Sequence, residues 1–231
     1  MFSLIYILYF WAMYNKSEIE LKVAEFLLQI KAIKLQPNNP FTWASGWKSP
    51  IYCDNRITLS HPSVRTYIRQ KLTQLVQEEF GSVDLIAGVA TAGIPQGVLV
   101  AQELGLPFAY VRAKAKEHGT GSLIEGEIVE GQRVVVVEDL ISTGKSSLQA
   151  VDALKKAGLS VAGLVSIFTY GFDQAEENFK QAKCRYSSLS NYSTLIQYAA
   201  EHSFIGQSDV ELLANWRRDP SGWGKEQEQL T

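Results

Sequence analysis

The run of residues 133–147, RVVVVEDLISTGKSS, constrains the fold of this chain more than any other segment. Its four consecutive valines form a continuous apolar run, which is typical of a strand buried on both faces of a parallel sheet. Two acidic residues, Glu138 and Asp139, stand at the carboxyl end of this expected strand, and a loop of small polar residues then opens a helix. In open α/β sheets, ligands bind at the carboxyl ends of the strands. The segment therefore predicts both a fold class and a binding site.

Further apolar runs, separated mostly by helix-like segments, continue this pattern along the chain. Strands that alternate with helices favour an α/β fold with an open, mainly parallel sheet flanked by helices. The expected strands cover 84–89, 107–112, 133–138 and 161–168, with a weaker one over 184–189. Helices are expected from Pro62 onward, over 194–201 and over 210–218.

The N-terminal part of the chain has a different character. Residues 1–12 are almost wholly apolar, but they are too short to span a bilayer and lack the basic start of a signal peptide. We interpret them as an upstream-extended start, with the functional chain beginning at Met13; a membrane anchor is the alternative. A capping box at Ser17 predicts that a helix begins there and runs to about Lys34. Residues 36–59 are then expected to form an irregular loop or short hairpin that carries function.

Composition limits the remaining possibilities. With 231 residues, of which 46% are hydrophobic, residues 13–231 are expected to form a single domain with small appendages. The net charge of −2 supplies no field to hold a polyanion, so nucleic acid is not expected as a partner. Cys53 and Cys184 lack the spacing of a metal or redox site, which favours a reducing cytoplasm.

The loop of residues 142–146, STGKS, has the composition of a phosphate site. Backbone N–H groups, hydroxyls and the start of the following helix can converge on a phosphate there, while Glu138 and Asp139 can accept hydrogen bonds from a ribose diol. The pair of features predicts a ribose 5-phosphate site. In a Walker A motif, G-x-x-x-x-G-K-[ST], Asp139 would have to be glycine, and its carboxylate would repel the nucleotide phosphates. The plainer alternative, that the two acids only end a strand, leaves the polar loop unexplained.

These residues resemble the signature of type I phosphoribosyltransferases, which bind phosphoribosyl pyrophosphate (PRPP). The resemblance implies the type I phosphoribosyltransferase fold and a catalytic role for Asp139. It also implies that PRPP is bound by Glu138, Asp139, Leu140, Ile141, Ser142, Thr143, Gly144, Lys145 and Ser146.

Residues 112–121, RAKAKEHGTG, predict a mobile basic flap suited to closing over a highly charged anion, although a solvated charged loop is the alternative. The pattern R-x-x-x-K-x-H-G is similar to the flexible catalytic loop of orotate phosphoribosyltransferases. This resemblance implies that Arg112, Lys116 and His118 contact PRPP and that Lys116 and His118 are catalytic. It further implies a homodimer in which the flap of one subunit closes over the site of its partner.

Two other stretches are similar to the same enzymes. Residues 41–54, FTWASGWKSPIYCD, resemble the N-terminal segment that forms part of a hood, here about 17–60, over the base. Tyr52 can stack on orotate, with Ser142 as a second contact, whereas Trp43 and Trp47 are as readily explained by local packing. The stretch 88–95 corresponds to the pyrophosphate loop, formed here by Thr91, Ala92 and Gly93.

Some members of the family carry lysines where this chain has Ala44, Ala92 and Ala113, and an arginine near Tyr170. The resemblance then implies that backbone amides, the flap cations and Ser142 carry more of the recognition. The expected reaction, part of pyrimidine biosynthesis, joins orotate to PRPP and gives orotidine 5'-monophosphate and pyrophosphate. Mg²⁺ is expected as cofactor, held mainly by PRPP with no direct protein ligand, and no membrane partner is expected. A purine phosphoribosyltransferase and a non-catalytic PRPP-sensing regulator are the alternatives.

Overall fold

The computed structural model describes residues 4–43, 45–114 and 122–223. The chain divides into two compact units. The central unit is Thr58–Asn191, and the terminal unit joins Met1–Ile57 to Tyr192–Thr231. The terminal unit therefore combines segments from both ends of the chain.

Within the described residues, the central unit contains a six-stranded sheet with the order β10-β9-β8-β5-β6-β7. Every neighbouring pair is parallel except β6 and β7, which are antiparallel. This arrangement confirms the expected open, mainly parallel sheet. The strands are β5 (Leu85–Val89), β6 (Phe108–Val111), β7 (Ile124–Glu125), β8 (Arg133–Ile141), β9 (Ser160–Thr169) and β10 (Tyr186–Asn191).

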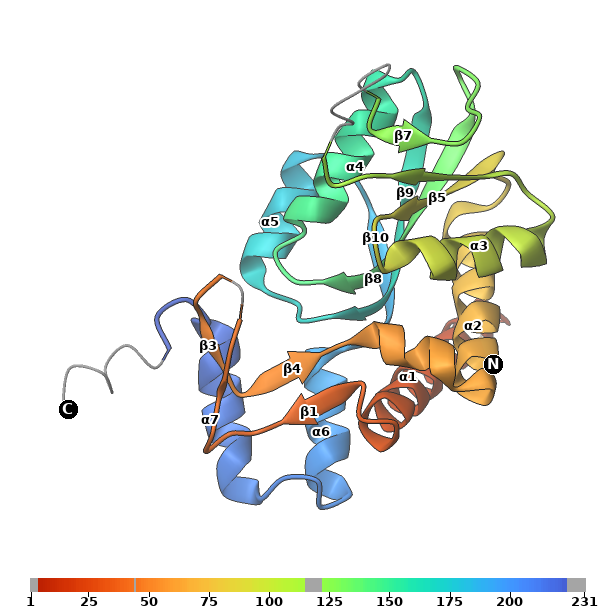
Figure 1. Ribbon diagram of the computed structural model, residues 1–231. Coiled ribbons are helices and arrows are strands. Elements are labelled where there is room, and N and C mark those ends of the chain that lie inside the picture. The colour runs from red at the N-terminus through yellow and green to blue at the C-terminus, as the bar shows by residue number, and fades with distance from the viewer. Residues whose placement is uncertain (1–3, 44, 115–121, 224–231) are drawn as a thin grey trace. The chain divides into compact units, whose positions relative to one another are not determined.

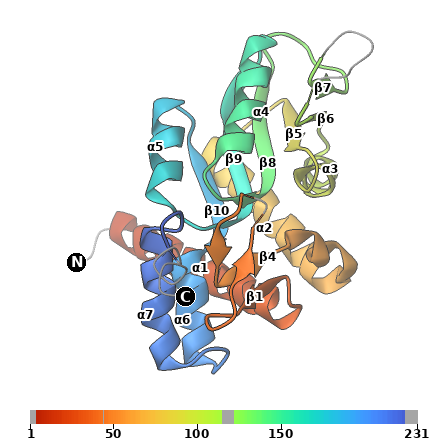
Figure 2. The ribbon, with the colours of Figure 1, turned by 60° about the vertical axis from the view of Figure 1, so that its left-hand side comes forward.

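Helices flank the sheet on both faces (Figures 1 and 2). They are α2 (Pro62–Phe80), α3 (Gly93–Leu104), α4 (Lys145–Lys156) and α5 (Asp173–Gln181). The connection from β5 through α3 to β6 runs one way along the sheet, whereas β8 through α4 to β9 runs the other way. Because parallel crossovers are right-handed, α3 and α4 lie on opposite faces. The neighbouring strands β5 and β8 therefore mark the point where the strand order reverses.

Strand β8 has a long buried centre. Residues Val134–Val137 are fully buried, as the apolar run predicted. The strand is longer than expected, because its pairing with β9 continues through Leu140 with Phe168 and Ile141 with Thr169. The expectation that Glu138 ends the strand is therefore wrong. Both acidic residues lie within β8, which continues to Ile141.

The terminal unit combines helices with short strands. Its elements are α1 (Leu4–Gln29), β1 (Ile33–Leu35), β2 (Phe41–Thr42), β3 (Lys48–Ser49), β4 (Ile51–Cys53), α6 (Tyr192–Glu201) and α7 (Gln207–Arg218). β1 pairs with β4 and β2 pairs with β3, both antiparallel, which confirms the short hairpin expected in this region. The fully buried Trp216 of α7 donates a hydrogen bond to the carbonyl of Lys48 (3.2 Å), so α7 holds this hairpin.

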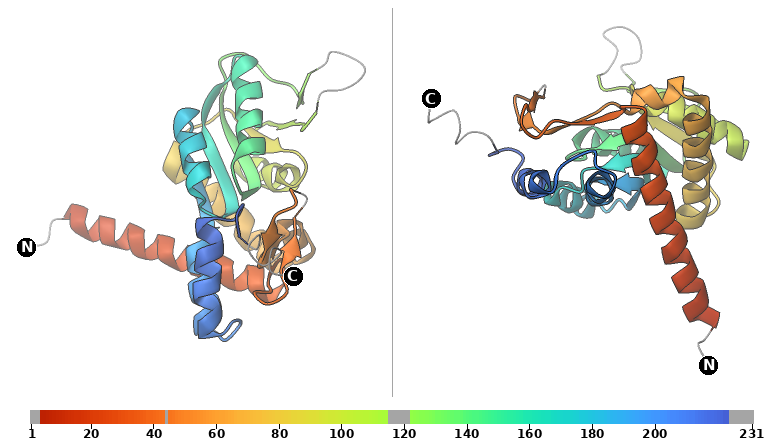
Figure 3. Two further views of the ribbon diagram at one scale, coloured as in Figure 1. Left: turned by 90° about the vertical axis from the view of Figure 1, so that its left-hand side faces the viewer. Right: turned by 90° about the horizontal axis from the view of Figure 1, so that it is seen from below.

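The first helix differs from the sequence-based expectation at both ends. It begins at Leu4 and is continuous across Ser17, as Figure 3 shows, so the capping box there does not start a helix. A side-chain cap is needed only where the first turn of a helix lacks preceding helical residues. The helix ends at Gln29, because Lys31 adopts a left-handed conformation (φ 59°) and the chain then enters β1. Among the described helices, none is long and apolar enough to cross a membrane.

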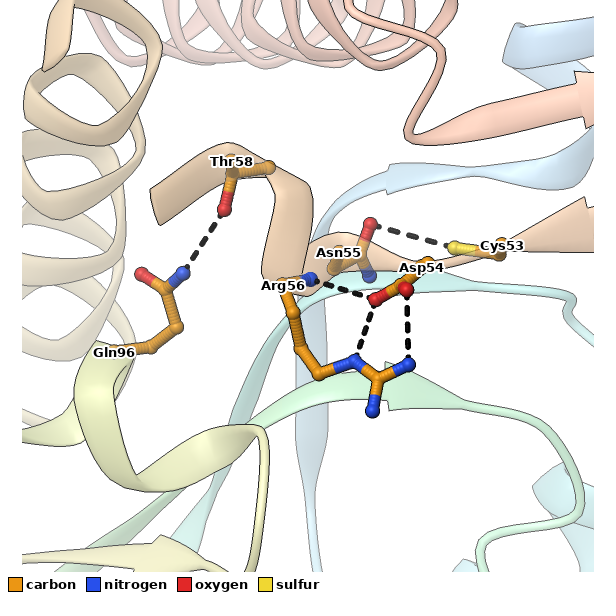
Figure 4. A network of polar contacts seen from close by, with 6 residues as sticks. All are labelled: Cys53, Asp54, Asn55, Arg56, Thr58 and Gln96. Carbon is orange, nitrogen blue, oxygen red and sulfur yellow. Dashed lines mark hydrogen bonds and ion pairs between the residues drawn. The ribbon is translucent and has the colours of Figure 1, made fainter. Parts of the chain in front are cut away.

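A short 3-10 helix, Asn55–Ser60, connects the two units along the chain. In the terminal unit, the Arg56 guanidinium contacts both oxygens of Asp54 (2.6 and 2.8 Å) and lowers the pKa of that carboxyl (Figure 4). In the central unit, the buried side chain of Gln96 donates a hydrogen bond to the hydroxyl of Thr58 (3.1 Å). This bond ties the start of the central unit to α3.

Candidate active site

Two loops leave the same edge of the sheet at the point where the strand order reverses. One joins β5 to α3 and the other joins β8 to α4. The two strands are parallel neighbours, with Gly88 opposite Val137, so their carboxyl ends lie together. Each loop ends at a helix whose first N–H groups have no partner within that helix, and such helix starts attract anions. The edge thus offers two adjacent sites for negative groups.

Gly93, the last residue of the pyrophosphate loop, packs directly against β8. A Cβ atom at this position would lie 2.5 Å from the carbonyl oxygen of Val137 and 3.3 Å from the Cα of Glu138. Only glycine permits so close an approach. The sequence-predicted pyrophosphate loop therefore packs against Val137 and the backbone of Glu138. In the same loop, Thr91 is exposed and Ala92 is half-buried.

Glu138 is held in one orientation inside the fold. Its side chain is 5% exposed, its Oε1 accepts a hydrogen bond from the N–H of Asp139 (3.0 Å), and its Oε2 accepts one from the hydroxyl of Ser147 (3.1 Å). Burial, followed by the nearby charge of Asp139, raises the pKa of Glu138 well above its ordinary value. A buried carboxylate gains from further donors, and the hydroxyls of a ribose would supply them. Asp139 is half-buried and follows it directly.

The phosphate loop, residues 142–146, forms the transition from β8 to α4. Ser142 and Thr143 are half-buried, while Lys145 and Ser146 are exposed at the first turn of α4. Gly144 is the N-cap residue and has a left-handed backbone (φ 75°), which glycine adopts without strain. The loop has the small polar residues and the helix start that a phosphate group requires.

Leu140 and Ile141 precede this loop within β8. The Ile141 side chain is fully buried in the core and its carbonyl accepts a hydrogen bond from the N–H of Tyr170 (3.0 Å). Leu140 is half-buried. The buried side chain of Ile141 therefore anchors the phosphate loop in the core. Only the backbone of Ile141 remains near the carboxyl end of the sheet.

The basic flap begins where β6 ends, next to β5 at the same edge of the sheet. The backbone N–H of Arg112 donates to the carbonyl of Leu123 (2.8 Å), and its guanidinium lies 3.4 Å from a carboxyl oxygen of Glu125 in β7. Lys116 and His118 fall in the segment 115–121, outside the described residues. The structure thus gives the position of Arg112, whereas the roles of Lys116 and His118 stay predictions.

Tyr52 belongs to β4 of the terminal unit. Its side chain is 39% exposed and its ring lies 5.6 Å from that of Phe41. Trp43 donates a hydrogen bond to the carbonyl of Ile51 (3.2 Å) and meets Trp216 edge-on at 5.7 Å. Local packing therefore accounts for Trp43, and Trp47 stacks on it at 6.3 Å.

Sequence reasoning missed two residues that hold the site together. Ser147 donates to Glu138, and the side-chain amide of Asn178 in α5 donates to the carbonyl of Thr143 (2.9 Å). Ser147 stands beside the recognised motif, so its hydroxyl was a usable signal. Asn178 comes 35 residues after Thr143, and only the fold brings it near.

Comparison with known proteins agrees with this geometry. The model of the phosphoribosyl transferase domain family matches residues 58–201. The orotate phosphoribosyltransferase of Phocaeicola vulgatus is 58% identical over 200 residues, which cover 87% of this chain and 94% of that protein. The chain belongs to the orotate phosphoribosyltransferase family.

Solved orotate phosphoribosyltransferases share the fold. The enzyme from Aeropyrum pernix has a TM-score of 0.70 and 28% identity, over 80% of this chain and 99% of that one. The enzyme from Mycobacterium tuberculosis, solved in complex with PRPP, has a TM-score of 0.60 and 25% identity, over 77% of this chain and 98% of that one. The type I phosphoribosyltransferase fold expected from the sequence is therefore confirmed.

Proposed function

We propose that this member of the orotate phosphoribosyltransferase family transfers ribose 5-phosphate from PRPP to orotate. The products are orotidine 5'-monophosphate and pyrophosphate, and the reaction is that of a pentosyltransferase in pyrimidine biosynthesis. The observation that carries the proposal is the contact of Gly93 with Val137 and Glu138. It supports a site with two helix starts, one for the 5'-phosphate and one for the pyrophosphate of PRPP, and a carboxylate pair suited to the ribose between them.

Each part of PRPP then has its own partners. The 5'-phosphate lies on the phosphate loop at the start of α4, and the ribose hydroxyls donate hydrogen bonds to Glu138 and Asp139. The pyrophosphate lies at the start of α3, on the backbone of Thr91, Ala92 and Gly93. Charge supports this placement of the three parts of PRPP. Both anionic ends lie at backbone N–H groups, and the neutral ribose hydroxyls lie at Glu138 and Asp139.

In the reaction, N1 of orotate loses its proton to solvent or to the leaving pyrophosphate and forms a bond to C1' of the ribose, while the bond from C1' to the pyrophosphate oxygen breaks. Configuration inverts, and no protein nucleophile takes part. Negative charge grows on the leaving pyrophosphate, where Arg112, Lys116 and His118 of the basic flap would neutralise it. Loss of such a cation would raise the barrier by about 2–4 kcal/mol, by analogy with a lost oxyanion donor.

Mg²⁺ fits this site as an ion carried mainly by the substrate. It prefers oxygen ligands and is often bound through substrate phosphates together with one or two carboxylates. In the part of the chain that the structure describes, no group of three or more His, Cys, Asp or Glu side chains is placed to hold a metal. In this proposal PRPP oxygens supply most of the ligands, and the bound ion adds positive charge at the leaving group.

The orotate side of the proposal rests on Ser142 and Tyr52. Ser142 is half-buried directly after β8, where its hydroxyl and backbone offer polar contacts. Tyr52 presents an exposed ring of the kind that stacks on a flat heterocycle. We further propose that the enzyme is a homodimer with the flap closing over the partner's site. A cytoplasmic location is supported by the two free cysteines.

A panel of bases tests this function. The chain is incubated with PRPP and Mg²⁺ together with orotate, adenine, hypoxanthine or guanine, and consumption of each base is measured. Consumption of orotate alone is the expected result. Consumption of a purine base instead would make the chain a purine phosphoribosyltransferase, and PRPP binding without turnover of any base would make it a PRPP sensor.

A further inference from the structure

Helix α5 contacts the phosphate loop through two neighbouring residues. The side-chain amide of Asn178 donates a hydrogen bond of 2.9 Å to the carbonyl oxygen of Thr143. The aromatic ring of Phe179 lies against Gly144, since a Cβ atom on that glycine would be only 2.6 Å from the ring. Two successive residues of one helix thus contact two successive residues of the loop.

The bond from Asn178 determines where an N–H group of the loop points. In a trans peptide, the carbonyl of one residue and the N–H of the next lie in one plane and point in opposite directions. Because the Thr143 carbonyl is directed at α5, the N–H of Gly144 is directed away from α5. Asn178 therefore fixes one of the donors that a phosphate at the start of α4 would use.

Phe179 limits how far the loop can move. Its side chain is 2% exposed and its ring lies 4.3 Å from that of Tyr186, so it is itself held in place. Gly144 has a left-handed backbone, and its Cα faces the ring without an intervening side chain. The loop cannot relax toward α5, because the ring already occupies that space.

We infer that Asn178 and Phe179 are positioning residues for the 5'-phosphate of PRPP. They do not contact the substrate; they hold the Thr143–Gly144 peptide in the orientation that binds it. The inference rests on the proposed function, since it takes the phosphate loop to be the 5'-phosphate site. Its consequence is selective, because the pyrophosphate loop leads into α3 and not into the loop that α5 contacts.

The central variant is Asn178→Asp, which keeps the shape of the side chain but replaces the donor by a carboxylate oxygen facing the Thr143 carbonyl. Asn178→Ala removes the donor without adding repulsion. Gln181→Ala is the matched control, because Gln181 is an exposed amide on the same helix that donates to Glu177 one turn away. Thermal melting of all three verifies that they are folded.

The KM for PRPP is expected to rise about fivefold in Asn178→Ala, the loss of one ordinary hydrogen bond, and about tenfold or more in Asn178→Asp. The kcat should stay within about twofold, since the lost interaction binds ground state and transition state alike. Inhibition separates the two ends of PRPP. The Ki of ribose 5-phosphate should rise with the KM for PRPP, whereas the Ki of pyrophosphate should not change.

Phe179→Leu gives a second, independent test of the inference. It keeps an apolar side chain but leaves space behind Gly144, so the KM for PRPP should rise while the kcat is retained. An active unmodified chain whose Asn178→Asp variant keeps its KM for PRPP would overturn the inference and leave the proposed function intact. An equal loss of kcat, both KM values and melting temperature would also overturn it, because α5 would then be only structural. An unmodified chain that consumes no orotate would remove the proposed function and this inference together.

Discussion

The hydroxyl of Ser147 donates a hydrogen bond of 3.1 Å to a carboxyl oxygen of Glu138, and both side chains are almost completely buried. Ser147 lies in the first turn of α4, whereas Glu138 lies in β8. The bond therefore links the strand that carries the acidic pair to the helix whose start would receive the phosphate. In the proposed function, the groups that bind the ribose and the phosphate would therefore share one rigid support.

The buried state of Glu138 predicts a pH dependence of stability in the ligand-free chain. Burial raises the pKa of Glu138 in the folded state, so the folded chain holds this proton more tightly than the unfolded chain does. Its contribution to stability is then complete below the unfolded pKa, about 4.3, and is lost as pH rises through the folded value. Glu138→Gln should remove this loss, because the amide does not ionise.

Urea unfolding of both proteins at about pH 5 and about pH 8 measures the effect. Relative to Glu138→Gln, the native chain should lose free energy of unfolding between the two values. Taking the difference between the two proteins cancels the titration of other groups. An identical difference at both pH values would mean that Glu138 ionises as easily in the folded chain as in the unfolded one.

Asp139→Asn should lower the turnover of PRPP while leaving the fold intact. Hydrogen bonds to a charged group contribute about 1.5–3 kcal/mol, so a loss of roughly 10-fold to 100-fold is expected if Asp139 binds the ribose. Steady-state kinetics with saturating orotate gives the loss, and thermal melting is the control. Equal losses of activity and of folded protein would indicate that Asp139 is structural.

Gly93→Ala should damage the site because the added Cβ meets the Val137 carbonyl at 2.5 Å. The backbone of the pyrophosphate loop or of β8 must shift, and activity should fall by at least about tenfold. Gly105→Ala, at the other end of α3, is the comparison. Its Cβ meets nothing within 4 Å, so it carries only the strain of a left-handed backbone (φ 66°). Similar activity losses in the two variants would show that the contact at Gly93 is not what matters.

The proposed sharing of the flap across a dimer predicts complementation. Lys116→Ala lacks a flap cation and Asp139→Ala lacks part of the PRPP site, so neither homodimer is active. After unfolding and refolding the two together, about half of the dimers are mixed, and each has one complete site if the flap reaches the partner. About a quarter of native activity should return. No recovery in a mixture shown by mass spectrometry to contain heterodimers would place each flap over its own subunit.

The sequence predicted the sheet well because its strands are marked by continuous apolar runs. Val134–Val137 is buried on both faces, and the loop after it opens α4 at Lys145, within the recognised motif. Features of this kind are encoded within a few neighbouring residues.

Contacts between distant segments were not predictable in the same way. Nothing near Thr143 indicates that Asn178 will bond to it, and nothing near Lys48 indicates that Trp216 will. The start of α1 was misplaced because a capping box is a local signal, whereas the helix continues upstream of it. Such features depend on which elements the fold brings together.

The most direct test of the central claim is the stoichiometry of the reaction catalysed by the purified chain. With PRPP, Mg²⁺ and orotate, the account predicts that one orotidine 5'-monophosphate and one pyrophosphate appear for each orotate consumed, and that the reaction stops when either substrate is omitted. Pyrophosphate release at the same rate with and without orotate would contradict it, because PRPP would then be hydrolysed rather than transferred.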